Sequence, residues 1–412
     1  MKNIHLNPHM TIMFLGLSLF FYHYYDASLL FNYYTRYYNL RNDNILVFIM
    51  ILAPFTLSST GCPIGGVLIT FWQSKVRNYV FPYLFLFDCT LSIFSNLLIN
   101  YIYLKPVLIL ALVCRALQGM LIGGLLPQYV IYFYAESRSV AQKVRYSTLF
   151  FIIFYICVIL SIIMVNFTSA RINSIVNWII TFGYLIVVLL IFNYKIVWQK
   201  FNIDGVCIDH SWSFIKTIIS NRWTIIRFTG FITFMASINA FFLTVMPVFL
   251  THYLNYSADN VFEMQIIIMI VGIVGFIFGY VYHASIGRKA HLAMGMVIKI
   301  LMFILFKLYM RHNIYLIELI GSACLFCFGI MAAKILLIIN SVFSTKARLH
   351  GVATTYNVSW GLMFGFSGFL TMHLIERFHD LYIPSLIIML FSFISLISLW
   401  FTPDKDFFRY LE

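Results

Sequence analysis

Twelve long apolar runs constrain this chain more than any other feature of its sequence. An α-helix needs about 20 predominantly apolar residues to cross the hydrocarbon core of a bilayer. A strand of a membrane β-barrel has about ten residues of alternating polarity, and the chain shows no such alternation. We therefore predict an all-α integral membrane protein with twelve transmembrane helices. The runs cover residues 11–33, 45–70, 79–99, 106–133, 147–167, 174–194, 224–250, 260–282, 291–309, 314–340, 352–373 and 382–402.

The composition supports this class and argues against others. Of the 412 residues, 62% are apolar and only 10% are charged, which is more apolar surface than a water-soluble core could bury. The net charge of +13 comes from cations scattered over short polar segments, so we expect no nucleic-acid partner. Cys324 and Cys327 have the spacing of metal ligands, but no second pair or nearby histidine completes a site. We expect no metal, no cofactor and no enzymatic activity, since no catalytic cluster is visible.

The longest polar interval divides the runs into two groups of six. It predicts an N-terminal six-helix half at 1–194, a cytoplasmic central loop at 195–222, a C-terminal six-helix half at 223–403 and a cytoplasmic tail at 404–412. Two such halves are typical of transporters built from parallel repeats, whose substrate binds between the halves near the bilayer midplane. The polar segments on the N-terminal side of the membrane hold more than twice as many Lys and Arg residues as the opposite loops. This bias predicts that both termini are cytoplasmic.

Ionisable side chains at membrane depth are expensive and should face a cavity or a partner. Asp26 and His23 lie one helical turn apart in the first run and could exchange a proton, because histidine titrates near physiological pH. Arg115 in the fourth run could hold an acid ionised or bind an anionic substrate. The alternative is that these groups only tie helices together. For Asp88, a further acid in the third run, we favour a structural pair.

Several segments resemble the metabolite:proton symporters of the major facilitator superfamily, which include transporters of proline betaine, citrate, 2-oxoglutarate and shikimate. The resemblance covers most of the chain. Its motifs are His23-Tyr-Tyr-Asp26, Pro63-Ile-Gly-Gly66, Arg115-Ala-Leu-Gln-Gly119 with Gly123-Gly124, and the ordered residues Phe343, Thr345, Arg348, Gly351, Tyr356 and Asn357. The family's proline is replaced by Ser344, its first-helix glutamate by His23 and its second-helix arginine by Cys62.

The resemblance implies the major facilitator fold, in two six-helix pseudo-repeats, and a set of functional residues. Proton coupling would fall to Asp26, His23 and Arg115. Candidates for substrate binding are Arg115, Gln118, Tyr356 and Asn357, although interhelical hydrogen bonding is the favoured role for the last two. Asn239 and Lys334 are added as polar side chains in apolar runs of the second half, and not from the resemblance. Gly119, Gly123 and Gly124 are expected to permit close helix contact. Gating would involve Lys75, Arg77, Arg288, Lys289 and Arg348, but both cytoplasmic loop motifs of the superfamily lack their acidic residue here.

These features predict a secondary active transporter that carries a small organic acid or zwitterion together with protons by alternating access. The expected partners are this small molecule, protons and the lipid bilayer, and we expect a monomer in the inner, cytoplasmic membrane of a bacterium. Two alternatives stay open. One is an uncoupled facilitator or efflux carrier of the same fold, because the loop acids are missing. The other is a transport-inactive membrane sensor or scaffold.

Overall fold

Long helices make up nearly all of the described chain. The computed structural model describes residues 11–22, 44–76, 80–99, 105–137, 139–167, 170–193, 214–305, 313–345 and 347–403. In these ranges, the described part of each predicted apolar run is helical, except for turn or bend residues at 282, 333–334, 382 and 401–402. Seven of the described helices are both long and apolar enough to cross a membrane. The prediction of an all-α fold is therefore confirmed.

The first half begins with the helical segment Thr11–Tyr22 and continues with five labelled helices. These are α2 (Asn44–Val76), α3 (Val80–Ile99), α4 (Lys105–Glu136), α5 (Val140–Phe167) and α6 (Ala170–Asn193). The second half contains α8 (Phe214–Ser220), α9 (Arg222–Ala240), η1 (Phe241–Val245), α10 (Met246–His252), α11 (Ala258–Val281), α12 (Arg288–Ile304), α13 (Ile314–Ala332), α14 (Ile335–Val342), α15 (Arg348–Asn357), η3 (Val358–Leu362), α16 (Met363–Phe378) and α17 (Ile383–Trp400). The segments η1 and η3 are single π-helical turns inside longer helices.

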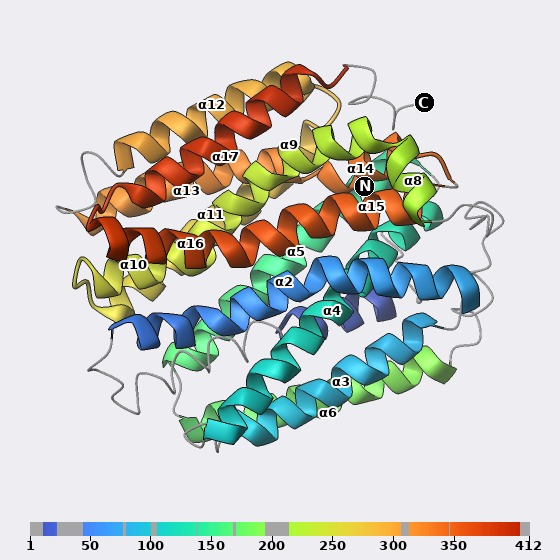
Figure 1. Cartoon of the computed structure of the whole chain (residues 1–412), viewed down its shortest axis with the longest axis horizontal. Helices are drawn as coiled ribbons and strands as arrows, with labels where there is room; N and C mark the ends of the chain where they lie inside the picture. The colour runs from blue at the N-terminus through green and yellow to red at the C-terminus, as the bar shows by residue number, and fades with distance from the viewer. Residues whose placement is uncertain are drawn as a thin grey trace.

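The arrangement repeats between the two halves. Helices α3 and α6 pack together along one edge of the molecule, and α12 and α17 pack together along the opposite edge (Figure 1). Between the halves, α2 packs on α15, η3 and α16, while α5 packs on α11. Counted in spans, these are the second with the eleventh and the fifth with the eighth. A shift of six spans converts one contact into the other, as two six-helix repeats require.

Glycines let helices within each half approach backbone to backbone. A Cβ on Gly119 of α4 would overlap the carbonyl of Ser58 in α2, and one on Gly65 of α2 would overlap Met120 of α4. In the second half, Gly275 of α11 and Gly329 of α13 lie equally close to the backbone of the partner helix. Lipid offers no hydrophobic driving force between helices, so close van der Waals packing at small residues has to hold them together. The predicted role of Gly119 and Gly123 in close packing is confirmed, since Gly123 meets Cys62 of α2 in the same way.

Two segments that the sequence predicts as loops contain helix. Helix α5 starts at Val140, so Lys143 and Arg145 lie in its first two turns and not in a loop before residue 147. The predicted central loop 195–222 contains α8, while residues 195–213 lie outside the described residues. A helix forms its backbone hydrogen bonds within its own segment, so it can continue into polar residues beyond the apolar run. Apolar length alone therefore underestimates helix length.

We expect Gly119→Ala to lower the free energy of unfolding by about 2–3 kcal/mol, because the added methyl must push α2 and α4 apart. The matched control is Gly183→Ala in α6, where an added Cβ meets nothing within 4 Å. The control should be neutral or slightly stabilising, since alanine is the better helix former. The measurement is the temperature at which each purified variant loses its monodisperse peak in detergent. Equal midpoints for the two variants would contradict the close-contact role.

Candidate functional site

A cavity lies between the two halves, beside the place where α2 packs on η3. Its volume is about 60 Å³, which is room for a few water molecules. The lining comes from the first helical segment, α2, α4 and α5 of the first half, and from α15 and η3 of the second. It consists of Phe20, Phe21, Ser59, Cys62, Ile122, Leu126, Phe150, Phe151, Phe154, Tyr356, Asn357, Trp360 and Gly361. None of these residues carries a formal charge.

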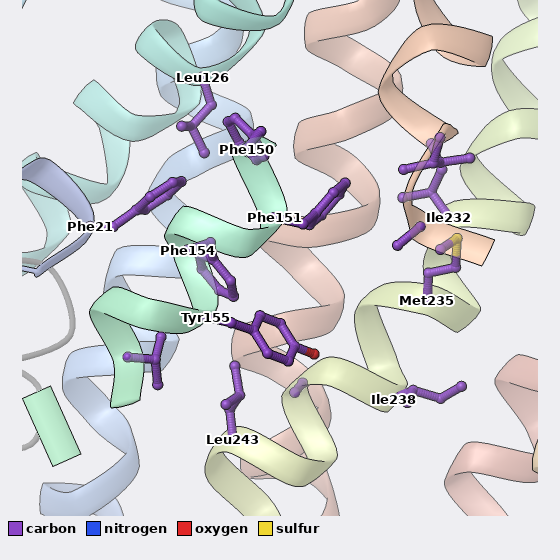
Figure 2. Packing of buried hydrophobic residues seen from close by; sticks show 14 of the residues in the cluster. Phe21, Leu126, Phe150, Phe151, Phe154, Tyr155, Ile232, Met235, Ile238 and Leu243 are labelled. Carbon is purple, nitrogen blue, oxygen red and sulfur yellow. The ribbon is translucent and has the colours of Figure 1, made fainter. Parts of the chain in front are cut away.

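Aromatic side chains of α5 form one wall of the cavity. Figure 2 shows Phe150, Phe151 and Phe154 projecting from α5. Phe21 and Leu126 lie on one side of these rings, and the labelled α9 residues lie on the other side. The Phe21 ring lies edge-on to Phe154, with 5.0 Å between ring centroids. The Phe151 ring stacks on Phe276 of α11, with centroids 5.5 Å apart. The cavity wall is therefore also part of the contact between the halves.

The opposite wall is built by α15 and η3. Tyr356 stacks on Trp360 one turn later, with centroids 5.8 Å apart, and Trp360 also lies 6.3 Å from Phe151. The π-helical turn Val358–Leu362 widens the helix where Trp360 and Gly361 meet the cavity. Such turns are frequent at functional sites. The sequence does not single out Trp360 as a functional residue. The feature that could have identified it is its position one helical turn after Tyr356, on the same face of the helix.

Asn357 connects the halves directly. Its Nδ2 donates to the backbone carbonyl of Gly123 in α4, at 2.6 Å. Gly66 of α2 leaves the space that the Asn357 side chain occupies. The structure thus brings Tyr356 and Asn357 to the cavity, with the Asn357 amide engaged in an interhelical hydrogen bond. The favoured role of Asn357 as an interhelical tie agrees with this geometry.

Asn239 lies next to the cavity wall and not in its lining. Its Oδ1 accepts a hydrogen bond from the Tyr155 hydroxyl, at 2.8 Å, which is a second polar link between the halves. Asn239 is fully buried in α9, two residues before the π-helical turn η1. Gln265 of α11 donates to the carbonyls of Phe242 and Leu243 in that turn, both at 3.2 Å. The irregular backbone of η1 is therefore hydrogen-bonded by a neighbouring helix.

Arg115 and Gln118 belong to a buried polar cluster within the first half. The Arg115 Nη1 donates to Gln118 Oε1 at 2.6 Å, and Gln118 Nε2 donates to Ser92 Oγ of α3 at 3.3 Å. Asp88 of α3, one turn before Ser92, interacts electrostatically with Arg115 and accepts a hydrogen bond from the Tyr184 hydroxyl at 2.9 Å. Arg115, Gln118 and the cavity-lining Ile122 recur at helical spacing, so they share one face of α4. The cluster adjoins the cavity without lining it.

Lys334 lies away from the cavity. It is fully buried at the turn between α13 and α14, and its Nζ donates to the carbonyls of His283 and Ile286 in the loop between α11 and α12. The structure therefore does not bring Lys334 together with the other residues that were predicted to bind substrate. A lysine at this depth holds a loop because backbone carbonyls are the acceptors within reach.

The predicted gating residues are only partly visible. Arg348 is half-buried at the start of α15, and Lys289 is exposed in the first turn of α12. Arg77 lies outside the described residues, and for Lys75 and Arg288 only the helical backbone is described. The predicted proton-coupling pair His23 and Asp26 also lies outside the described residues, directly after Tyr22 in the chain. Among the described residues no group of three His, Cys, Asp or Glu side chains could hold a metal ion.

Solved structures show where this arrangement of helices occurs elsewhere. The chain is similar to the proton:xylose symporter XylE, a major facilitator superfamily protein solved with 6-bromo-6-deoxy-D-glucose, with a TM-score of 0.70, 14% identity and 96% of both chains covered. It is also similar to a D-xylose-proton symporter structure, with a TM-score of 0.65, 15% identity, and 96% of this chain and 97% of that one covered. No protein-family model matches the sequence, and no curated protein matches it. The chain is thus a multi-pass membrane protein with the major facilitator fold.

Proposed function

We propose that the protein is a secondary transporter that carries a small zwitterionic metabolite together with protons by alternating access. The observation that carries this proposal is the cavity between two pseudo-repeats of a transporter fold. The two similar structures are titled as proton symporters, which supports coupling to protons. The substrate would bind in the cavity while the contacts between the halves alternate between the two ends of the bundle.

The lining favours a substrate with no net charge. A free organic acid would need a cation in the cavity, and the described lining provides none. Aromatic faces instead attract a methylated ammonium group through cation–π interaction, as in the recognition of quaternary ammonium ligands. Of the two predicted substrate classes, organic acid and zwitterion, we therefore favour the zwitterion. A sugar is supported less well, because its many hydroxyls would meet few polar groups: the lining offers Ser59, Tyr356, the Trp360 indole N–H and the Cys62 thiol, while the Asn357 amide is already engaged.

Proton coupling would use the ionisable groups beside the cavity. Arg115 lies in the polar cluster on the cavity side of α4, and His23 and Asp26 come directly after the helical segment that supplies Phe20 and Phe21, outside the described residues. Protonation of an acid that pairs with Arg115 would weaken the pair and change the packing of α4 against its neighbours. An uncoupled carrier of the same fold is the second candidate, because the loop motif that precedes α12 has no acidic residue. We place the protein in a bacterial cytoplasmic membrane as a monomer, with both termini inside.

Uptake into proteoliposomes tests the substrate class and the coupling together. The panel is a set of radiolabelled betaines with proline, citrate, 2-oxoglutarate and xylose, each with and without an inward proton gradient. We expect accumulation of a betaine that collapses when an uncoupler is added. Accumulation of citrate or xylose instead would contradict the zwitterion assignment, and betaine flux that ignores the gradient would establish the uncoupled carrier.

Trp360 tests the aromatic recognition. We expect Trp360→Leu to raise the KM for the transported zwitterion about tenfold, since a desolvated cation–π contact contributes roughly 1–2 kcal/mol. Trp360→Phe keeps an aromatic face and should stay within about threefold of the natural protein. The control Trp400→Leu changes a tryptophan that is exposed at the end of α17. An equal KM in the Leu and Phe variants at position 360 would rule out recognition through the ring.

Asp26 and Arg115 test the coupling mechanism. Asp26→Asn should abolish proton-driven accumulation but preserve exchange of labelled for unlabelled substrate, because exchange needs no net proton movement. Arg115→Gln should impair both activities, since it also removes the cation from the cluster with Gln118. Asp380→Asn is the matched control, because Asp380 lies in the turn before α17 and not in an apolar run. Gradient-driven accumulation that is unchanged in both variants would exclude these residues from coupling.

A further inference from the structure

The two halves meet through an unusual set of charges at one end of the bundle. We call this the basic end and define it by the C-termini of α4 and α14 and the N-termini of α5 and α15. Lys143 of α5 places its Nζ 4.2 Å from the centroid of the Tyr134 ring in α4. Arg348 of α15 places its guanidinium 4.9 Å from the same ring. One aromatic ring therefore contacts a cation from its own half and a cation from the other half.

No carboxylate takes part in this contact. Within the described residues, neither Lys143 nor Arg348 forms an ion pair, and the remaining hydrogen bond of Arg348 runs from Nε to the carbonyl of Asn340 at 3.0 Å. Both cations thus have neutral partners, a ring and a carbonyl.

The same neutral chemistry holds the second half together at this end. Lys334 binds the carbonyls of His283 and Ile286, in the loop whose superfamily motif normally contains an acid. Thr148 of α5 donates to the carbonyl of Ala333, next to Lys334, at 3.3 Å across the two halves. Beside these contacts a cavity of only about 10 Å³ remains, lined by α4, α5 and α14 residues that include Tyr134, Ser147 and Asn340. The described residues of the two halves are thus in contact at the basic end.

We propose that Tyr134 is the gating residue of the basic end, and that its cation–π contact with Arg348 joins the two halves there, where both cytoplasmic loop motifs have no acidic residue in the sequence. This inference rests on the proposed alternating-access function. Lys143 belongs to the same half as Tyr134, so it keeps the ring in place throughout the cycle. Arg348 belongs to the other half, so its contact with the ring must break when this end opens.

The Tyr134 ring stabilises a pair of cations that would otherwise repel each other. Lys143 and Arg348 repel each other, and the negative faces of the Tyr134 ring offset that repulsion. Removal of the ring would leave two cations facing each other without a compensating group, so the closed state would be disfavoured. In an ion pair, by contrast, the two charges attract each other directly and need no third group between them. The Tyr134 ring is therefore the group on which the contact between Lys143 and Arg348 depends.

The experiment measures opening without any substrate. Ser147→Cys places a thiol in the lining of the small cavity, where the natural serine is buried. The rate of labelling by a membrane-impermeant maleimide is measured in proteoliposomes, and the natural chain without this substitution gives the background. We expect Tyr134→Leu to raise the labelling rate about tenfold, which corresponds to about 1.4 kcal/mol. Tyr134→Phe and Tyr134→Trp, which keep the ring, should label at close to the natural rate.

A double-mutant cycle separates the cation–π contact from simple packing. In an Arg348→Met background, Tyr134→Leu should have little additional effect on labelling, because the contact is already absent. Additive effects, or labelling that rises equally in the Phe and Leu variants, would overturn the proposal. Only variants that elute as a single peak are compared. If the protein transports no substrate of the panel but shows this labelling pattern, the gate proposal stands and the substrate proposal fails. The two proposals can therefore fail separately.

Discussion

The structure depends on the close approach of helix backbones at glycine. Apolar side chains are as well solvated by lipid as by one another, so helices in a bilayer associate where their surfaces fit most closely. Gly65 and Gly119 bring α2 and α4 into such contact, and Gly275 and Gly329 do the same for α11 and α13. Each half therefore has a rigid central pair. The cavity lies against the α2–α4 pair, which supplies four of its lining residues.

Several buried cations among the described residues donate to neutral partners. Arg115 donates to Gln118, Lys334 donates to backbone carbonyls, and Arg348 contacts a ring and a carbonyl. In a medium without water, a buried polar group that lacks a hydrogen-bond partner costs free energy, whether the missing partner would be neutral or charged. Neutral acceptors meet this requirement without adding a second buried charge.

The fold was largely predictable from the sequence, whereas the site was predictable only in part. Helices of the predicted type occur at every run because apolar length is a one-dimensional property. Tyr356 and Asn357 were identified from their order in a motif, and both line the cavity. Trp360 and the aromatic residues of α5 were not identified, since an aromatic residue in an apolar run looks the same whether it faces lipid or a cavity. Lys334 is predicted to bind substrate from its place in an apolar run alone, whereas the structure places it at the turn before α14, with its Nζ against the loop between α11 and α12.

The sequence by itself determined that the chain crosses a membrane, that its helices fall into two groups of six, and which polar residues interrupt the apolar runs. These properties follow from run length, spacing and composition, which need no knowledge of neighbours. Only the tertiary structure decided which of those polar residues meet, that the cavity lining is aromatic and uncharged, and that Tyr134 lies between Lys143 and Arg348. Such contacts join residues more than 200 positions apart, as with Tyr134 and Arg348. Their formation depends on the rotation of each helix about its own axis and on its distance from its neighbours, and the packing of the whole bundle fixes both.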